Sequence, residues 1–533
     1  MSTTTPKAIS ARAVSIGLLF AAGCLAALPL PAKTLRMASA FDPQSMDPHA
    51  LALQYQSRVV TQVYESLVDR DRNFALEPSL ALSWQQVEPK RWRFKLRPGV
   101  RFHDGTPMTA EDVVFSIERA LSKNSQRSFQ LRGIQSVRKV DDLTVDFLLA
   151  APDAVLTEKF IFVGVMSKAW SAAHGVMEPQ NYNARQETYA VRNANGTGPY
   201  RLKSYESDAR TVLVANPYWW GRRGNVDEAI YEVIQSDATR MAALFSGQVD
   251  FVIDPPFQDV ARLKQDGRFK LADMTDIGTQ YLGFDQSRDE LEFSTIKGRN
   301  PFKDLRVRRA IYQAIDIDAI VAKVLRGQAV ATGSYFSRLV DGYAPELDHR
   351  LPYDPAAARA LLKEAGYAEG FGVTLDCVNV AFRAAVCQAI AGMLAQVGIK
   401  TSAQVWPTAT FFPRITQSAT SFFEFGWSPL TDAWPSLNAM LHSRTDDGVG
   451  TFNGGRYTNA RLDKIIDAIR VEPDAAQRRQ LVGDALRLMN ADLPLIPLYR
   501  RTLTWVMRPD ISVAQWPNDV LELRFVQIGE GNS

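Results

Sequence analysis

Residues 91–113 read RWRFKLRPGVRFHDGTPMTAEDV. In the first part of this stretch the apolar side chains of Trp92, Phe94 and Leu96 alternate with basic ones. Alternation of this kind is typical of a strand with one buried face. A Pro-Gly pair follows it, and such a pair marks a turn. The stretch therefore predicts a half-buried strand after which the chain turns back.

The end of the same stretch predicts a helix. Thr109 lies three residues before Asp112, which is the spacing of a capping box, and the helix is expected to run through Leu121. Apolar spacing predicts further helices over residues 58–67, 306–326, 356–365, 384–397, 461–469 and 475–489. Strands are expected over 33–40, 373–378 and 399–405, a loop over 76–84, and short strands over 494–528. The sequence thus favours an α/β protein in which 300–490 forms a βα domain.

Composition excludes several classes of protein. The chain has 533 residues, of which 46% are hydrophobic and 22% charged, and this excludes disorder as its main state. Its 61 Lys and Arg against 58 Asp and Glu leave a formal net charge of +3. A balance this close argues against nucleic acid as a partner. The length favours several domains or one large protein divided into lobes.

The N-terminus has the pattern of a secretory signal peptide. Lys7 and Arg12 precede an almost wholly apolar run over residues 13–30. A small residue, Ala32, follows, and we expect cleavage after it. The mature protein is therefore expected in the periplasm. An uncleaved anchor helix and a lipoprotein modified at Cys24 are the alternatives.

Export leaves two cysteines in an oxidising compartment. Cys377 lies in a predicted strand and Cys387 in the first turns of the helix that follows. A helix that packs back on the preceding strand can bring two such residues together, so we predict a disulfide between them. Two buried free thiols are the alternative.

Enzyme and metal motifs are absent from the sequence. It contains no HExxH, GxSxG, phosphate-binding loop or GxGxxG. The five histidines are scattered, with no two within six residues, so no local metal site is encoded. We expect no cofactor and no enzyme. A secreted hydrolase is a remote alternative, and it would need a nucleophile beside a base, which no stretch offers.

Five separate stretches together resemble the family 5 solute-binding proteins of ABC importers, the peptide- and nickel-binding class. The family signature falls in Arg97 to Pro107 and continues in Thr109 to Val113. The other stretches are residues 76–84, 196–200, 301–311 and the pair at 426–427. Their order and spacing are similar to those of the family over nearly the whole mature chain.

The resemblance implies an α/β, periplasmic-binding-protein-like fold. Two lobes with mixed sheets would be joined by a two-strand hinge near residues 281–284 and 497–504, with an extra subdomain in lobe I. The expected parts are a signal peptide (1–32), lobe I (33–69, 191–287 and 499–533), its extra subdomain (70–190) and lobe II (288–498).

The resemblance also implies a function. The chain would be a monomer that captures a small peptide or peptide-like solute between the closing lobes. It would deliver the solute to the permease subunits of an ABC importer and their ATPases. A non-peptide solute is the alternative, namely an opine, an oligosaccharide, glutathione or a metal chelate.

Candidate ligand residues follow the Gly-Trp pair. In peptide-binding relatives an aspartate three residues after that Trp pairs with the peptide's amino group, but Leu430 stands there. Asp432 is two residues further on and is expected to substitute, the alternative being a helix N-cap or turn residue. Trp427 and Trp434 are candidates for stacking on the solute, with core packing as the alternative.

The resemblance implies further ligand residues. Arg383 precedes a helix, in a segment that in dipeptide binders supplies an arginine for the ligand carboxylate; a surface arginine is the alternative. Arg456 and Tyr457 follow a Gly-Gly pair in a loop expected to reach the cleft. Met46 and Tyr55, from lobe I, are weaker candidates.

Overall fold

The structure, a computed structural model, describes residues 1–5, 32–446 and 448–529. The chain divides into two units, Met1–Ala32 and Lys33–Ser533. In the first unit, residues 1–5 are exposed and have no regular secondary structure, and the apolar run of the expected signal peptide lies outside the described residues. Within the described ranges, no helix combines the length and apolar character needed to cross a membrane.

The second unit is built on two mixed sheets. In the first, sheet I, β1 pairs in parallel with β10 and β11, while β10, β9 and β8 pair antiparallel. Its strands are β1 (Thr34–Ser39), β8 (Tyr200–Glu206), β9 (Arg210–Ala215), β10 (Glu228–Val233), β11 (Phe251–Val252) and β12 (Lys270–Thr275). The helices α5 (Asp237–Phe245) and α6 (Phe257–Gln265) connect β10, β11 and β12 in sequence.

The other large sheet, sheet II, has a parallel part and an antiparallel part. β15 pairs in parallel with β16 and β17, and β17 pairs antiparallel with β13. Its strands are β13 (Thr279–Phe284), β14 (Ala329–Ala331), β15 (Phe371–Val378), β16 (Ile399–Trp406) and β17 (Phe422–Trp427). The helix α10 (Ala381–Ala395) packs on β15 and β16 and buries Val386, Ile390 and Leu394 in the core.

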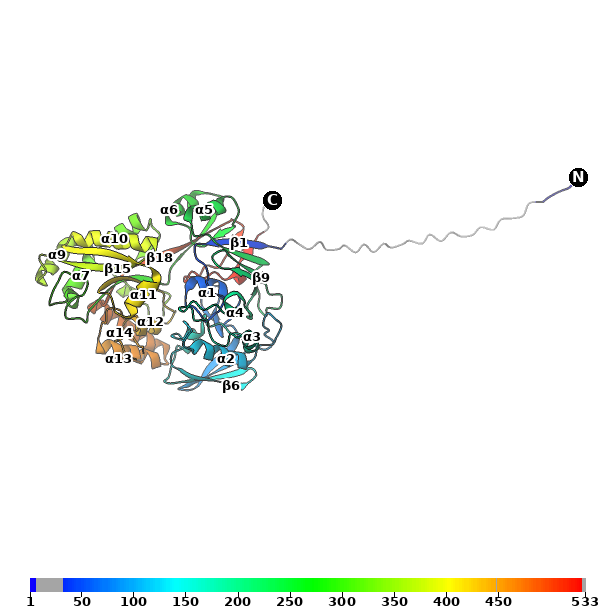
Figure 1. Cartoon of the computed structure of the whole chain (residues 1–533), viewed down its shortest axis with the longest axis horizontal. Coiled ribbons are helices and arrows are strands. Elements are labelled where there is room, and N and C mark those ends of the chain that lie inside the picture. The colour runs from blue at the N-terminus through cyan, green and yellow to red at the C-terminus, as the bar shows by residue number, and fades with distance from the viewer. Residues whose placement is uncertain (6–31, 447, 530–533) are drawn as a thin grey trace. The chain divides into compact units, whose positions relative to one another are not determined.

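One long strand, β18 (Leu495–Met507), belongs to both sheets. Its first half pairs with β13, and its second half pairs with β12 and β11. The other direct connection between the sheets is the short link 276–278 between β12 and β13. Figure 1 shows β18 between the group that contains β15 and α10 and the group that contains β1 and β9. Mixed sheets joined by two strand connections confirm the expected α/β class.

A third sheet, sheet III, lies within residues 70–190. Its strands are wholly antiparallel, in the order β4-β5-β7-β6. They are β4 (Ala81–Glu88), β5 (Arg91–Leu96), β6 (Ile134–Asp141) and β7 (Thr144–Leu149). The helix α2 (Ala110–Leu121) packs on β6 and β7 and begins with the predicted capping box of Thr109 and Asp112. The rings of Phe94, Phe147 and Phe160 pack together in the core of this sheet.

The remaining elements are short or lie outside the sheets. They are α1 (Gln54–Val60), β2 (Val68–Arg70), β3 (Leu76–Pro78), η1 (Leu156–Phe160), α3 (Lys168–Ala173), α4 (Tyr189–Arg192), η2 (Pro301–Lys303), α7 (Leu305–Ala314), α8 (Ile317–Ala319), η3 (Ile320–Val324), η4 (Pro345–Leu347), α9 (Pro355–Glu364), α11 (Thr408–Thr416), α12 (Trp434–Met440), α13 (Ala460–Val471), α14 (Ala475–Asp492), β19 (Ile511–Ser512), η5 (Leu523–Phe525) and β20 (Gln527–Ile528).

Two predicted elements near the start of the chain are wrong. The helix expected over 58–67 is α1, which ends at Val60, because the carbonyls of Gln62 and Val63 accept hydrogen bonds from Tyr200 and Gly198 instead. The loop expected over 76–84 contains β3 and the start of β4. β4 forms because it pairs with β5, and the sequence of β4 alone does not indicate this pairing.

The long helix expected over 306–326 is also wrong. α7 ends at Ala314, and Asp316 then caps a new helical segment by accepting a hydrogen bond from the Ala319 amide at 2.9 Å. A π-helical turn over Ile320–Val324 follows, and Gly327 ends the segment with φ of +76°. The tail is also less fragmented than expected, since β18 alone has 13 residues.

Candidate functional site

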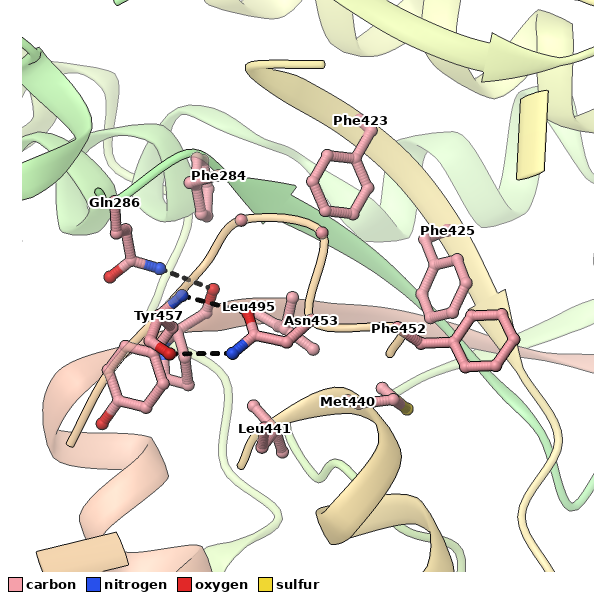
Figure 2. Close-up of a pocket in the computed structure, with 13 residues that line it drawn as sticks. Phe284, Gln286, Phe423, Phe425, Met440, Leu441, Phe452, Asn453, Tyr457 and Leu495 are labelled. Carbon is pink, nitrogen blue, oxygen red and sulfur yellow. Dashed lines mark hydrogen bonds between the residues drawn. The ribbon is translucent and has the colours of Figure 1, made fainter. Parts of the chain in front are cut away.

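A small cavity lies beside sheet II. Its lining residues come from β13, β17, the end of α12 and the loop 452–457. Figure 2 shows Phe423 and Phe425 on one side of it, with Met440 and Leu441 on the other. Its volume is about 10 Å³, which is room for about one water molecule. This cavity is a packing feature and is too small for a solute.

The loop beside this cavity contains two of the expected ligand residues. The Asn453 amide donates to the Tyr457 carbonyl at 2.8 Å, and the Tyr457 hydroxyl donates to Asp492 at 2.7 Å. Tyr457 is therefore a buried, internally bonded residue of the core. Arg456 is exposed and has a positive φ of +50°. Neither residue lines the larger pocket described next.

The larger pocket has a volume of about 430 Å³ and is open to solvent. This volume is within the usual range for small-molecule sites. Glu158, from the segment with sheet III, forms one side. The other lining residues are 338–343, 431–432 and 478–479, which all follow β13 in the chain. The pocket, which we name the acidic-arginine pocket, holds three carboxylates and three guanidinium groups.

Asp432 is the buried carboxylate of the acidic-arginine pocket. It is 6% exposed and lies in the loop between β17 and α12. Its Oδ1 accepts a hydrogen bond from the Trp434 amide at 2.7 Å, while its Oδ2 is 3.5 Å from Nε of Arg478. Burial raises the pKa of Asp432 to about 6, and the negative charges of Glu158 and Asp341 act in the same direction. A carboxylate that is buried and weakly paired is suited to bind a cation.

Glu158 joins two parts of the chain at this pocket. Its carboxylate is 3.3 Å from Nη2 of Arg70 and accepts a hydrogen bond from the Thr431 amide at 3.2 Å. The Thr431 hydroxyl also bonds this carboxylate and accepts a hydrogen bond from Arg70 at 3.0 Å. The pocket therefore lies where residues 70–158 meet the loop that carries Asp432.

The two candidate tryptophans occupy different environments. Trp427 ends β17, donates to Ser436 at 2.8 Å and packs edge-on against Phe452. Trp434 is buried, and Lys159 lies 5.0 Å from its ring centroid. Its indole N–H is buried without a hydrogen-bond partner among the described residues. Both side chains pack against the same apolar cluster, and neither lines the acidic-arginine pocket.

Arg383 has an internal acidic partner. Its Nε donates to Oε2 of Glu424 at 2.8 Å, and its Nη2 lies 2.7 Å from the same oxygen. Glu424 lies on β17 and is fully buried. Burial raises the pKa of Glu424, and the positive charge of Arg383 opposes this increase. The charge of Arg383 is thus balanced within the protein.

The two weaker candidates lie beside sheet I. Met46 is fully buried in the apolar core that contains Trp505. Tyr55 lies on α1, and its ring stacks on that of Phe41 at 5.5 Å between centroids. Neither belongs to the acidic-arginine pocket.

Sequence reasoning missed most of the residues around Asp432. They are charged or polar residues at places where solvated residues are common: Thr431 and Asp341 lie between helices and strands, Glu158 in the short turn η1, and Arg478 on the helix α14. No local pattern distinguishes them, because they come together only through contacts across the fold.

Cys377 and Cys387 lie together as expected. Both are buried, their Cα atoms are 6.6 Å apart, and their Sγ atoms are in contact between β15 and α10.

Comparisons with known proteins agree on one family. The sequence model of the protein family "Bacterial extracellular solute-binding proteins, family 5 Middle" matches residues 75–448 of this chain. The heme-binding protein A of Haemophilus influenzae is 27% identical over 82% of this chain and 81% of its own length. The dipeptide-binding protein of Escherichia coli (strain K12) is 26% identical over 94% of this chain and 95% of its own.

A solved structure shows the same fold. The periplasmic binding protein DppA of Helicobacter pylori, in complex with the peptide STSA, superposes with a TM-score of 0.80. The match covers 94% of this chain and 98% of that one, at 22% sequence identity. The α/β, periplasmic-binding-protein-like fold that the resemblance implied is therefore confirmed.

Proposed function

Because the chain belongs to the family 5 bacterial extracellular solute-binding proteins, we propose that it captures a small peptide or peptide-like solute for an ABC importer. The solute would be held between two closing lobes and passed to the permease subunits in the membrane. The relatives compared are binding proteins, and this supports a role in binding rather than in catalysis.

The observation that supports a peptide is the buried carboxylate of Asp432. A peptide's free amino group carries a positive charge, and a partly desolvated carboxylate binds such a group by a charge-assisted hydrogen bond. Asp432 is weakly paired by Arg478 and is within a pocket large enough for a small solute. Asp432 therefore takes the role that Leu430 cannot fill.

Closure would follow from the way the two large sheets are joined. They share β18 and the link 276–278, so rotation about these two connections changes the distance between the sheets. The contact of Glu158 with Thr431 joins the segment of sheet III to the loop that carries Asp432, and both residues line the acidic-arginine pocket. A solute that contacts both sides favours the closed state by its differential affinity for that state.

We further propose that the protein is exported and folds in the periplasm. The supporting observations are the N-terminal pattern, with cleavage after Ala32, and the contact between Cys377 and Cys387. A disulfide between these cysteines would form in that compartment.

A binding screen tests the peptide proposal. The exported protein would be unfolded and refolded to remove bound solute, then heated with di-, tri- and oligopeptides, glutathione, opines, oligosaccharides or nickel chelates. A ligand at 100 times its Kd adds about 2.7 kcal/mol to the free energy of unfolding. We expect higher melting temperatures with peptides in the parent protein and no such increase in Asp432→Asn. An increase only with a non-peptide class would contradict the proposal.

A further inference from the structure

The segment of sheet III meets the loop that carries Asp432 through the short turn η1. This segment lies in the chain between β1 and β8 of sheet I, and a fully buried ion pair fastens it to the residues after β1, with Nη2 of Arg119 2.7 Å from Oδ2 of Asp47. Residues 428–433, which we name the Asp432 loop, follow β17 of sheet II. A contact between η1 and the Asp432 loop therefore bridges the parts of the chain that carry sheet I and sheet II.

Glu158 of η1 holds Thr431 by its main chain and by its side chain. The Thr431 amide donates to Oε2 of Glu158 at 3.2 Å, and the Thr431 hydroxyl donates to Oε1. The Arg70 guanidinium lies 3.3 Å from the same carboxylate and donates to the Thr431 hydroxyl at 3.0 Å. The side chains of Arg70 and Glu158 are only 4% and 15% exposed. The three side chains thus bond one another at the edge of the acidic-arginine pocket.

The Asp432 loop is also held from its own side of the pocket. The Thr431 carbonyl accepts a hydrogen bond from the Asp341 amide at 2.6 Å, and the Asp432 carboxylate accepts one from the Trp434 amide at 2.7 Å. These contacts come from chain that follows β13, so they do not depend on sheet III. Glu158, with Arg70, supplies the hydrogen bonds that reach this loop from the other side.

The contact between the two parts of the chain does not depend on Glu158 alone. The Lys159 ammonium lies 5.0 Å from the ring centroid of Trp434 and donates to the Arg132 carbonyl at 3.1 Å. The Arg132 guanidinium in turn donates to the Gly448 carbonyl at 2.6 Å. We therefore expect variants of Glu158 to fold.

We propose that Glu158 is a positioning residue for solute capture, which holds Thr431 and Asp432 in the binding conformation when the two sides of the acidic-arginine pocket meet. Because it acts through Asp432, this role rests on the proposed function. Contacts made only in the closed state stabilise that state, and a loop fixed in advance loses less entropy when it binds a solute. Glu158 would in this way couple closure of the lobes to the affinity of Asp432 for a cation.

The charge of Glu158 gives this role a measurable signature. The charged groups that face Asp432 are Glu158 and Lys159 from η1, Asp341 from the segment 338–343, and Arg478 from α14. Burial, and after it the negative charges of Glu158 and Asp341, raises the pKa of Asp432 to about 6. Glu158→Gln removes one of these charges and keeps an oxygen acceptor, so Asp432 should ionise at a lower pH in this variant. A loss of stability alone would not produce that change.

Titration calorimetry between pH 5 and pH 7 tests the proposal with the dipeptide Ala-Phe as the probe. We expect Glu158→Ala to weaken binding about 10-fold, the loss expected for a hydrogen bond to a charged group. Glu158→Gln should restore part of the affinity and reach half of its maximal affinity at a lower pH than the parent protein. The matched control is Glu118→Ala, which removes an exposed carboxylate of α2 and should bind as the parent protein does.

Hydrogen exchange without solute tests the same contact independently of any ligand. The Thr431 amide should exchange about 10-fold faster in Glu158→Ala than in the parent protein or in Glu118→Ala, because its acceptor is gone. Amides of β17 should keep their parent rates. An equal increase in β17 would show general destabilisation and overturn the positioning role.

The outcomes separate the two proposals. Binding of Ala-Phe with equal strength in the parent protein and Glu158→Ala would support the peptide and overturn the role of Glu158. Failure of Ala-Phe to bind the parent protein would contradict the peptide proposal, and the exchange rate of the Thr431 amide would then decide whether Glu158 holds the loop. An unchanged exchange rate, or a pH midpoint that stays at the parent value in Glu158→Gln, would overturn the proposal.

Discussion

The guanidinium of Arg383 lies against the fully buried carboxylate of Glu424, with Nε 2.8 Å and Nη2 2.7 Å from Oε2. This pair connects the start of α10 to β17, the strand that leads to the loop of Asp432. An arginine held in this way stabilises a buried acid. Its positive charge is balanced by that acid, so it is not free to pair with a ligand.

The pair predicts that Arg383→Met destabilises the protein. Removal of one partner of a buried ion pair leaves the other charge unbalanced, which costs about 3–5 kcal/mol. Guanidinium unfolding should show this loss, and the double variant Arg383→Met with Glu424→Leu should recover most of it. Loss of carboxylate affinity in Arg383→Met at unchanged stability would instead show that Arg383 binds the solute.

Asp432 predicts a defined pH dependence of stability. Burial raises its pKa from 3.8 to about 6, so between these pH values the folded state holds a proton that the unfolded state releases. The free energy of unfolding therefore falls as pH rises through this window, by about 3 kcal/mol relative to Asp432→Asn. Chemical unfolding of both proteins at pH 4, 5, 6 and 7 measures the difference. Parallel curves for the two proteins would contradict the raised pKa.

The same carboxylate predicts how affinity changes with pH. A peptide ammonium binds the ionised form of Asp432, so the affinity for Ala-Phe should increase from pH 5 to pH 7. Asp432→Asn should bind weakly and with little change over this range. Titration calorimetry at each pH provides the measurement, and a peptide affinity that is constant with pH in the parent protein would count against this role.

The contact between Cys377 and Cys387 predicts sensitivity to reductant. A disulfide that closes a loop over a sequence separation of 10 contributes about 2–3 kcal/mol to stability. The double variant Cys377→Ser with Cys387→Ser should be less stable by this amount, and dithiothreitol should destabilise the parent protein without affecting the variant. Equal response of both proteins to dithiothreitol would indicate two free thiols.

Two glycines predict opposite effects of the same substitution. A Cβ on Gly455 would lie 1.9 Å from the Phe284 carbonyl oxygen, so Gly455→Ala should cost at least about 3 kcal/mol. Gly392 is exposed on α10, and a Cβ there would meet no atom within 4 Å beyond its own helix backbone. Gly392→Ala should therefore stabilise the helix by about 0.5–1 kcal/mol. Thermal unfolding compares the two, and a mild effect at Gly455 would show that the 452–457 loop can move away from β13.

Local sequence patterns were sufficient to predict the helices and strands whose stability depends mainly on their own residues. Strand β5 follows from the alternation around Phe94, and the start of α2 follows from the hydrogen bonds of Thr109 and Asp112. The bounds predicted for the helix at 356–365 and the strand at 399–405 agree with those of α9 and β16 within one or two residues. Periodicity and capping act over a few residues, so sequence alone contains this information.

Elements whose ends or pairing depend on contacts with distant segments of the chain were not predictable from local patterns. α1 ends early because Gly198 and Tyr200 bond the carbonyls that a longer helix would use. The pairing of β4 with β5 creates a strand where the sequence alone favours a loop.

The sequence by itself determined the α/β class and the resemblance to family 5, and it made Asp432 a candidate ligand residue. Only the tertiary structure decided that Arg383 pairs with Glu424 and that Glu158 meets Thr431. The physical reason is that a charge is balanced or left unbalanced by the groups within a few ångströms of it. Those groups come from segments up to 273 residues away along the chain, and folding alone brings them together.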